Sequence, residues 1–237
     1  MNKLKSGAWP EGSVIELKST IHQIIASLNI PIRNEDLTFR PMTAEDLPQF
    51  KALMAEWFPF EYSDYFYDQA FTSTNYSFLA CSWTPPNQSK SYIIAGILIR
   101  FETDSRAFNY VTDKEITTKI SCCTRLINYL KNWNNENAYI STIGVIDEAR
   151  RLGIASRLLD IAYEKAKKKK NCVSISLHVL TTNQQAIRCY EKNGFVHVCN
   201  VKNYYTIQGK TYDARYYVKK VRDKDNYEEI EGLILQD

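Results

Sequence analysis

The sequence predicts an α/β fold with a mixed central sheet and helices on both faces. In the middle of the chain, apolar runs that are typical of strands alternate with segments whose apolar residues recur at helical spacing. Towards both ends, strand-like runs follow one another directly across short turns or loops, as in hairpins. Alternating strands and helices favour parallel pairing and hairpins require antiparallel pairing, so the two patterns together predict a mixed sheet.

The first third of the chain contains an extension and the start of a domain. Within residues 1–36, apolar residues at helical spacing predict an amphipathic helix at Ser13–Leu28. We expect this helix to pack on the domain; binding to a protein partner or a membrane surface is the alternative. The domain, 37–221, then begins with a strand and a helix that Thr43 can cap. The elements expected in this part are a strand at 37–40, helices at 44–56 and 63–71, and a hairpin of strands at 76–82 and 91–101.

An insertion, 103–137, separates this hairpin from the rest of the domain, and a helical pattern lies inside it. A strand at 138–146 and a helix at 154–165 follow. The remaining elements expected are a strand at 173–180, a helix ending at Asn193-Gly194, a final hairpin of strands at 195–205 and 213–221, and a fraying acidic tail at 222–237.

The composition limits the class of protein. The chain has 237 residues, of which 44% are hydrophobic, and this is enough for one sizeable core. A net charge of +3 indicates no nucleic-acid partner. The six cysteines show no C-x-x-C spacing and the three histidines are scattered, so we expect reduced thiols and no metal site. No secretory signal and no apolar run of membrane-spanning length are visible, which favours a cytoplasmic protein.

Lysines gather at the end of the helix predicted at 154–165, at Lys165 and 167–170. Cations at a helix C-terminus interact favourably with the helix dipole, by about 0.3–1 kcal/mol each. We expect this capping role. An RNA-facing patch is the alternative, although no aromatic residues are interleaved with the lysines.

A basic loop between a predicted strand and a predicted helix is the first candidate site. It reads Asp147-Glu-Ala-Arg-Arg-Leu-Gly-Ile-Ala-Ser156. Gly153 lets the backbone approach a ligand closely, because it has no side chain. The N–H groups of the first helical turn, with Arg150 and Arg151 beside them, suit a phosphate or pyrophosphate. An ordinary strand–helix connection with solvated arginines is the alternative.

Two motifs in this region resemble a known family. Arg150-x-x-Gly153-x-Ala155 resembles the R/Q-x-x-G-x-G/A acetyl-CoA signature of the GNAT acetyltransferases. Further along, Asn183-Gln-Gln-Ala-Ile-Arg-Cys-Tyr190-Glu-Lys-Asn-Gly194-Phe195 is similar to the family's second signature. The resemblance implies the GNAT acyl-CoA N-acyltransferase fold, with acetyl-CoA as cosubstrate. The residues that it implies for acetyl-CoA binding are Ile143, Val145, Arg150, Arg151, Gly153, Ile154, Ala155, Ser156, Asn183 and Tyr190.

Three further stretches resemble N-terminal acetyltransferases of the NatF type, with the NatE catalytic subunit next. They are Leu177-His-Val-Leu-Thr-Thr-Asn183, Trp57-Phe-Pro-Phe-Glu-Tyr62 and Tyr204-Tyr205-Thr-Ile-x-Gly209. In those enzymes a strand tyrosine and a strand histidine act through ordered water as the base, and these map to Tyr139 and His178. Tyr190 completes the implied catalytic set. The residues implied to line the peptide groove are Phe58, Pro59, Phe60, Glu61, Tyr62, Tyr139, Tyr204 and Tyr205.

Each of these residues also has an ordinary structural interpretation. His178 can be a hydrogen-bonded core histidine, Tyr139 can be core packing, and Tyr190 can fill a helix–sheet interface. The aromatic loop at 57–62 can be a hydrophobic plug. Their joint spacing favours the functional interpretation, and a groove of amphipathic rings also accounts for the 16 tyrosines.

The resemblance implies acetyl transfer to protein N-termini, with Met followed by a non-small residue as the expected substrate. The chemistry agrees, because an α-amino group has a pKa of about 7.7–8.0 and lysine about 10.4. A base that acts through one water is therefore sufficient for an N-terminus. One alternative is a protein lysine (histone) acetyltransferase. Another is a catalytically idle GNAT-fold subunit that docks a partner through helix 13–28 or insertion 103–137.

Two features depart from the NatF pattern. Ala155 replaces a glycine at the end of the first signature, a change that the family tolerates. The animal enzymes have a long C-terminal region that anchors them to the Golgi membrane, whereas the sequence here ends in the acidic segment 222–237. Peripheral membrane association is implied by family analogy only, and we expect no anchor region.

Overall fold

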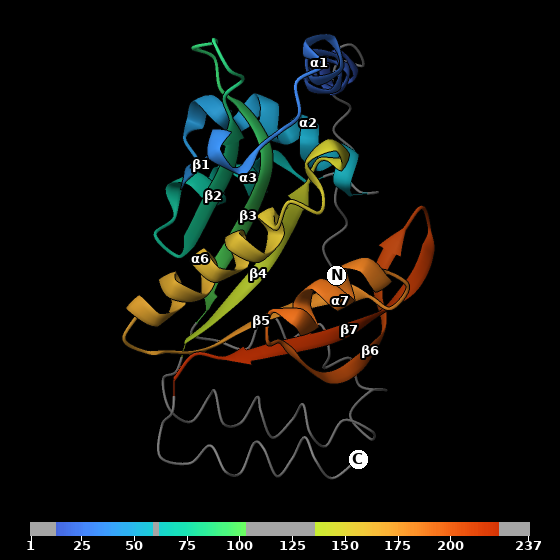
Figure 1. Ribbon diagram of the computed structural model, residues 1–237. Helices are drawn as coiled ribbons and strands as arrows, with labels where there is room; N and C mark the ends of the chain where they lie inside the picture. Colours follow the sequence, from blue (N-terminus) through green and yellow to red (C-terminus); the bar gives the residue numbers. More distant parts are fainter. Residues whose placement is uncertain (1–12, 59–61, 103–135, 223–237) are drawn as a thin grey trace. The chain divides into compact units, whose positions relative to one another are not determined.

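The computed structural model of the chain describes residues 13–58, 62–102 and 136–222 (Figure 1). The strands form a seven-stranded sheet with the hydrogen-bonded order β1-β2-β3-β4-β5-β7-β6. β4 and β5 are parallel, whereas the pairs β1–β2, β5–β7 and β6–β7 are antiparallel. The predicted mixed α/β sheet is therefore confirmed. The insertion 103–137 and the tail 222–237 lie, apart from their edges, outside the described residues.

The chain divides into two compact units. Unit 1 consists of Met1–Leu98 and Thr142–Leu158, and unit 2 of Ile99–Ser141 and Leu159–Asp237. Strands β3 (Tyr92–Glu102) and β4 (Glu136–Val145) and helix α6 (Ile154–Lys168) each contribute residues to both units.

Unit 1 contains the N-terminal helix and the first hairpin. Its further elements are α1 (Ser13–Leu28), β1 (Leu37–Pro41), α2 (Leu47–Trp57), α3 (Asp64–Thr72) and β2 (Tyr76–Trp83). The core forms around Phe50 of α2, which is fully buried and meets Phe78 of β2 edge-on at 4.5 Å between ring centroids. Helix α1 packs against α2 (Figure 1), and its Ile21 and Ile25 are buried. The predicted helix at Ser13–Leu28 and its packing on the domain are confirmed.

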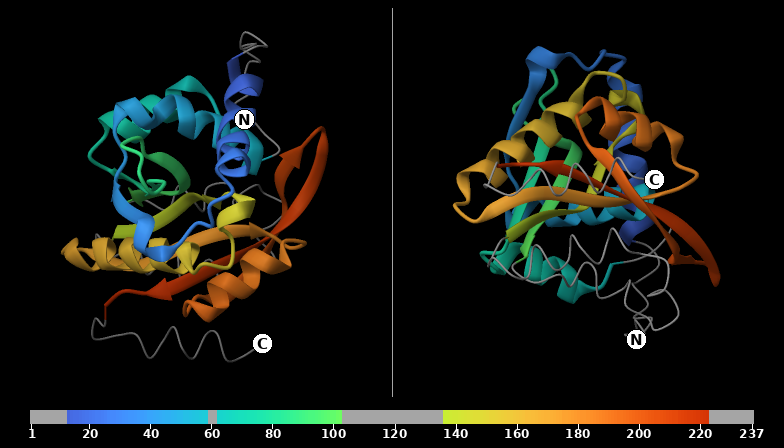
Figure 2. Two further views of the ribbon diagram at one scale, coloured as in Figure 1. Left: turned by 45° about the horizontal axis from the view of Figure 1, so that its top comes forward. Right: turned by 90° about the horizontal axis from the view of Figure 1, so that it is seen from below.

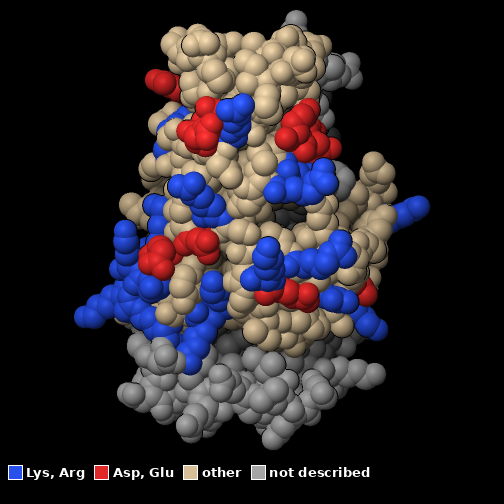
Figure 3. Space-filling view, viewed as in Figure 1, with Lys and Arg blue, Asp and Glu red and all other residues tan. Residues whose placement is uncertain are grey.

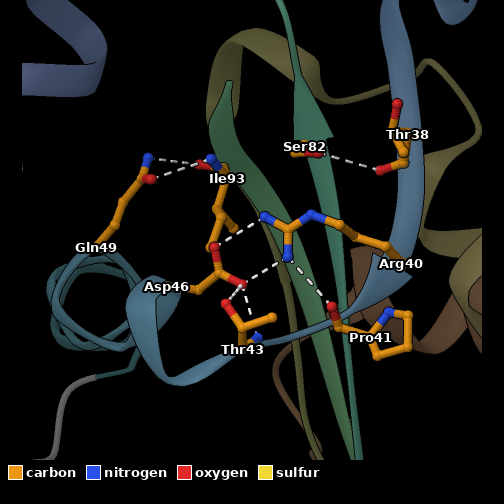
Figure 4. A network of polar contacts seen from close by, with 8 residues as sticks. All are labelled: Thr38, Arg40, Pro41, Thr43, Asp46, Gln49, Ser82 and Ile93. Atoms are coloured by element: carbon orange, nitrogen blue, oxygen red, sulfur yellow. Dashed lines mark hydrogen bonds and ion pairs between the residues drawn. The ribbon is translucent and has the colours of Figure 1, made fainter. Parts of the chain in front are cut away.

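The connection from β1 to α2 is held by a polar network (Figure 4). Arg40 donates two hydrogen bonds to the carboxylate of Asp46, at 2.6 and 2.8 Å. The same carboxylate accepts from the backbone N–H of Thr43 at 2.8 Å and from its hydroxyl at 3.1 Å. Thr43 therefore caps the helical segment as predicted, although a short 3₁₀ turn, Ala44–Asp46, precedes α2. Gln49 then ties α2 to the backbone of Ile93 on β3 through both its amide atoms.

Unit 2 contains β5 (Cys172–Leu180), α7 (Gln184–Lys192), β6 (Val196–Ile207) and β7 (Lys210–Lys220). A buried side-chain network joins β4 and β5: Ser174 donates to Asn137 at 2.9 Å, and Asn137 donates to Ser176 at 2.7 Å. The register pairs of these two strands run from Glu136 with Cys172 to Tyr139 with Ser176. The network therefore sets the register at the position where Tyr139 lies.

The final hairpin is longer than predicted. Pairing of β6 with β7 continues beyond Tyr205 to Ile207 and Lys210, and the hairpin curves along its length (Figure 2). Gln208 and Gly209 form a two-residue turn with φ values of 49° and 77°, as a type I′ turn requires. The sequence suggested earlier strand ends because the polar residues of this exposed segment hide the alternation that marks a strand.

The lysines at the end of α6 gather on one part of the surface (Figure 3). Lys167 pairs with Glu164 at 3.1 Å, and the Lys169 ammonium lies 4.2 Å from the centroid of the Phe101 ring. Lys165, Lys167 and Lys168 occupy the last turn of α6, where cations interact favourably with the helix dipole. These contacts agree with the capping role expected from the sequence.

The cysteines differ in state. Cys81, Cys172 and Cys189 are free thiols, as expected, but Cys199 on β6 is disulfide-bonded. The expectation of reduced thiols is therefore wrong for Cys199, because a disulfide depends on the distance between two residues in space and not on their spacing in the sequence. Within the described parts of the chain, no three His, Cys, Asp or Glu side chains cluster as metal ligands would. No described helix is long and apolar enough to cross a membrane.

Candidate active site

The basic loop lies in unit 1, where β4 leads into α6. A 3₁₀ turn, η3 (Asp147–Ala149), follows β4, and α6 begins at Ile154. Between them Arg151 and Gly153 have φ values of 66° and 77°. A side chain on Gly153 would meet no protein atom within 4 Å. Glycine is therefore needed here for the backbone conformation and leaves open space beside the first turn of the helix.

The two arginines of the loop differ in their contacts: Arg150 is held by neighbouring residues, and Arg151 is exposed. Arg150 forms an ion pair with Asp147 at 2.6 Å, and its Nε donates to the carbonyl oxygen of Val145 at 3.4 Å. The first N–H groups of an α-helix have no partner within the helix, and the positive end of the dipole lies there. The loop thus has the form of an anion-binding site, and its residues fit a pyrophosphate.

Strand β4 carries two buried hydroxyls, Ser141 Oγ and Thr142 Oγ1, that have no hydrogen-bond partner within the described residues. Buried polar groups almost always have a hydrogen-bond partner, so a buried hydroxyl without one indicates a place where a ligand or a water molecule can bind. Ile143 and Val145, also expected to bind acetyl-CoA, are half-buried on the same strand. Consecutive side chains of a strand point to opposite faces of the sheet, so a ligand on one face of β4 would reach one of the two hydroxyls. An amide-containing ligand, such as the pantetheine portion of acetyl-CoA, could supply that hydrogen bond.

Three aromatic side chains of unit 2 are linked through one hydroxyl group. Tyr139 Oη lies 3.1 Å from His178 Nδ1 and 3.1 Å from Tyr204 Oη. The rings of His178 and Tyr204 are stacked, with 4.1 Å between centroids and 11° between planes. Tyr139 comes from β4, His178 from β5 and Tyr204 from β6, so only the folded sheet brings them together.

The protonation states decide the direction of these hydrogen bonds. Burial lowers the pKa of His178 to about 3, so its ring is neutral at physiological pH. Burial and the neighbouring Tyr204 and Tyr205 raise the pKa of Tyr139 well above its ordinary value, so Tyr139 keeps its proton. If Tyr139 donates to His178 Nδ1, its oxygen accepts from Tyr204, and the chain of hydrogen bonds ends on a histidine acceptor. Such a chain can pass a proton from a substrate to His178.

Further residues hold the histidine and the tyrosine in place. The hydroxyl of Tyr205 donates to the carbonyl oxygen of His178 at 3.1 Å. Tyr216 is buried, pairs with His178 across β5 and β7, and lies 4.7 Å from it between ring centroids. The guanidinium of Arg100 lies 5.5 Å from the centroid of the Tyr139 ring. Tyr216 and Arg100 carry no signal in the sequence, because their contacts follow from strand register, which the sequence leaves open.

Comparison with known proteins identifies the family. Residues 47–195, more than half of the chain, match the Acetyltransferase (GNAT) family. The chain belongs to the GNAT acetyltransferases. The predicted resemblance, fold and acetyl-CoA-dependent acetyltransferase class are therefore confirmed.

Several relatives of this acetyltransferase are known by name. It is 30% identical over 190 residues to N-alpha-acetyltransferase 60 of Xenopus tropicalis, in a match that covers 79% of this chain and 71% of the relative. It is also 27% identical over 181 residues to histone acetyltransferase MCC1 of Arabidopsis thaliana, covering 76% of this chain and 68% of that one. The fold is similar to that of Arabidopsis thaliana NAA60 in complex with acetyl-CoA, with a TM-score of 0.64 and 23% identity over 78% of this chain and 98% of the other.

The other residues that were expected to bind acetyl-CoA lie on helix α6, or on helix α7 and its N-cap, in the acetyltransferase. Asn183 is the N-cap of α7 and accepts from the N–H of Ala186 at 3.1 Å, so its side chain has a structural role. Tyr190 is buried, 5.9 Å from Phe195 between ring centroids, and burial raises its pKa. Ile154 is buried at the start of α6, while Ala155 and Ser156 are half-buried.

The residues expected in the peptide groove come from both units. In unit 1, Tyr62 stacks on Phe66 at 4.4 Å and meets Phe58 edge-on at 5.9 Å. Pro59, Phe60 and Glu61 lie outside the described residues. In unit 2, Tyr204 and Tyr205 meet edge-on at 4.8 Å between ring centroids. Each unit thus presents its own aromatic cluster.

Proposed function

We propose that the enzyme transfers acetyl from acetyl-CoA to the α-amino group of protein N-termini, with Met followed by a non-small residue as the preferred start. The observation that carries this proposal is the linked Tyr139–His178–Tyr204 group. Its proton acceptor is a neutral imidazole, which suits an amine that is already about half neutral near pH 8. The similarity to N-alpha-acetyltransferase 60 supports the same assignment.

Acetyl-CoA, when bound, supplies a thioester carbonyl for attack by the neutral amine. The loop of unit 1, through Arg150, Arg151 and the first turn of α6, would hold the pyrophosphate. As the nitrogen–carbon bond forms, the nitrogen must lose a proton, and Tyr139 can accept it directly or through one water while passing its own proton to His178 Nδ1. Tyr190 stays protonated because burial raises its pKa, so its hydroxyl can donate a hydrogen bond to the departing thiolate.

Lysine acetylation is the second candidate, because histone acetyltransferase MCC1 is among the relatives. A lysine amine has a pKa of about 10.4 and is therefore mostly protonated at neutral pH. His178, with a pKa of about 3, is too weak a base to deprotonate an ammonium group of either kind at equilibrium. The neutral fraction of the free amine therefore decides, and near neutral pH this fraction is larger for the α-amine.

A peptide comparison tests the proposal. One peptide begins with free Met-Leu, and its matched control has a blocked N-terminus and one internal lysine. We expect kcat/KM to be at least about tenfold higher on the free N-terminus, which corresponds to about 1.4 kcal/mol in the barrier. Mass spectrometry should place the acetyl group on the α-nitrogen. Equal rates, with the product mapped to lysine, would instead make the protein a lysine acetyltransferase.

A further inference from the structure

His22, on α1, lies between two carboxylates from distant parts of unit 1. Its Nδ1 is 2.5 Å from Glu148 Oε1, and its Nε2 is 2.9 Å from Glu56 Oε2. Glu56 is in the last turn of α2, and Glu148 is in η3, the turn that precedes the basic loop. The three side chains are between 27% and 34% exposed. One imidazole ring thus joins three segments that are far apart in the sequence.

The geometry requires a charged ring. A neutral imidazole has one N–H, so its other nitrogen would present a lone pair to a carboxylate oxygen at hydrogen-bond distance. An imidazolium donates from both nitrogens, one to Glu56 and one to Glu148. Among the described residues, these carboxylates are the charged groups that act on the ring. Burial opposes the charge, but the hydrogen bonds to Glu148 and Glu56 outweigh it and raise the pKa of His22.

The bridge formed by the hydrogen bonds of His22 to Glu56 and Glu148 lies beside the apolar contact between α1 and α2. Ile21, next to His22, is 3% exposed, and Ile25, one turn further along α1, is 9% exposed. Helix α1 packs on α2 (Figure 1), and the hydrogen bond of His22 to Glu148 links α1 to η3 as well. Apolar packing alone is non-directional, so the paired hydrogen bonds are what specify where η3 lies relative to α1.

The position of η3 in turn determines the position of Arg150, the first arginine of the basic loop. Ala149 is fully buried, and its N–H bonds to the carbonyl oxygen of Ile146. Arg150 contacts Asp147 in two ways. Its backbone N–H donates to the carbonyl oxygen of Asp147 at 3.2 Å, and its guanidinium forms an ion pair with the Asp147 carboxylate at 2.6 Å. Glu148 lies between these two anchored residues. A displacement of Glu148 is therefore transmitted to Arg150 across one short, hydrogen-bonded turn.

We propose that His22 is a positioning residue for acetyl-CoA, because its charged ring fixes η3 through Glu148 and so holds the Arg150–Ser156 loop in its phosphate-binding conformation. This inference rests on the proposed function in naming acetyl-CoA as the ligand of the loop. It makes the N-terminal helix part of the cofactor-binding apparatus. The bridge is complete while the ring is charged, and it is lost as pH rises through the raised pKa of His22.

Calorimetric titration with acetyl-CoA tests the bridge. At about pH 6 we expect His22→Ala to weaken binding about fivefold relative to the wild type, and at about pH 9 the ratio of the two dissociation constants should approach one. His22→Lys keeps a cation and should restore the affinity at both pH values. Gln23→Ala is the matched control, because Gln23 is the exposed neighbour on the same helix.

Two results would overturn the inference. Equal affinities of His22→Ala and wild type at about pH 6 would remove the positioning role, and a ratio that does not change with pH would show that the charge is irrelevant. If His22→Ala does not fold, Glu148→Gln provides the same comparison, because it removes the charge and keeps the shape. No acceptor peptide is needed. A wild type that binds acetyl-CoA but acetylates no N-terminus would therefore refute the proposed function and leave this test intact.

Discussion

The hydroxyl of Tyr139 is the centre of the proposed proton path, so Tyr139→Phe is the most direct perturbation of the active site. Phenylalanine keeps the ring, which preserves the contact with Arg100 and the packing against His178 at 5.8 Å between centroids. It removes both 3.1 Å hydrogen bonds, to His178 Nδ1 and to Tyr204 Oη. The variant therefore tests one oxygen atom in an otherwise unchanged cluster.

The expected effects on rate and on stability can be separated. Loss of the general base lowers kcat by about a hundredfold or more, which adds at least about 2.7 kcal/mol to the barrier. Loss of two hydrogen bonds lowers the free energy of unfolding by about 1–3 kcal/mol. Acetyl-CoA affinity should be unchanged, because the hydroxyl of Tyr139 bonds to His178 and Tyr204, whereas the loop at Arg150–Ser156 would hold the pyrophosphate.

Steady-state kinetics with a saturating Met-Leu peptide, together with calorimetry and denaturant melts, measure these three quantities. Tyr205→Phe is the matched control, since it removes a hydroxyl that bonds to the His178 backbone at the same distance of 3.1 Å. It should raise KM for the peptide and reduce kcat much less. A Tyr139→Phe variant with wild-type kcat, or an equal fall in kcat for Tyr205→Phe, would refute the assigned role of Tyr139.

Three further measurements address the loop, the base and the fold. Gly153→Glu should abolish calorimetric binding of acetyl-CoA, because it places a carboxylate in the phosphate space. Gly153→Ala should mainly lower the free energy of unfolding, by about 1 kcal/mol, because alanine is strained at a φ of 77°. Unchanged affinity in folded Gly153→Glu would contradict the assignment of the loop. Because the pKa of His178 is about 3, the pH profile of kcat/KM should show a single rise, at the pKa of the substrate amine, about 8. A second rise in kcat/KM near pH 6.5 that disappears in His178→Ala would instead indicate a histidine that titrates at its ordinary pKa. Hydrogen bonds from Arg40 are the main cause of the lowered pKa of Asp46, so this carboxylate stabilises the fold above its unfolded pKa of about 3.9 and loses that effect as pH falls through its folded pKa. Denaturant melts should therefore show Asp46→Asn to be destabilised by about 1–3 kcal/mol at neutral pH, with a smaller difference from wild type near pH 3.

Local patterns in the sequence were sufficient for the elements and for the cofactor loop. The helix at Ser13–Leu28 has the predicted bounds, because its apolar spacing and the following Asn29 and Pro31 mark it without reference to the rest of the chain. The loop at Arg150–Ser156 could be recognised because strand, glycine and helix N-terminus are consecutive, and a site made by one continuous segment is visible in one dimension. For the same reason, the two family signatures were enough to indicate acetyl-CoA.

Contacts between distant segments were decided only by the tertiary structure. The sequence pointed to Tyr139 and His178 by resemblance, but the hydrogen bonds that link them to Tyr204, and the support from Tyr216, depend on the register of four strands. A shift of one residue in any strand would turn its side chains to the other face of the sheet. His22 carries no signal in the sequence, because its charge matters only once packing has brought Glu56 and Glu148 to its two ring nitrogens. The sequence therefore determined the elements and the chemistry available to them, whereas side-chain partners, and with them the pKa values, followed from long-range packing.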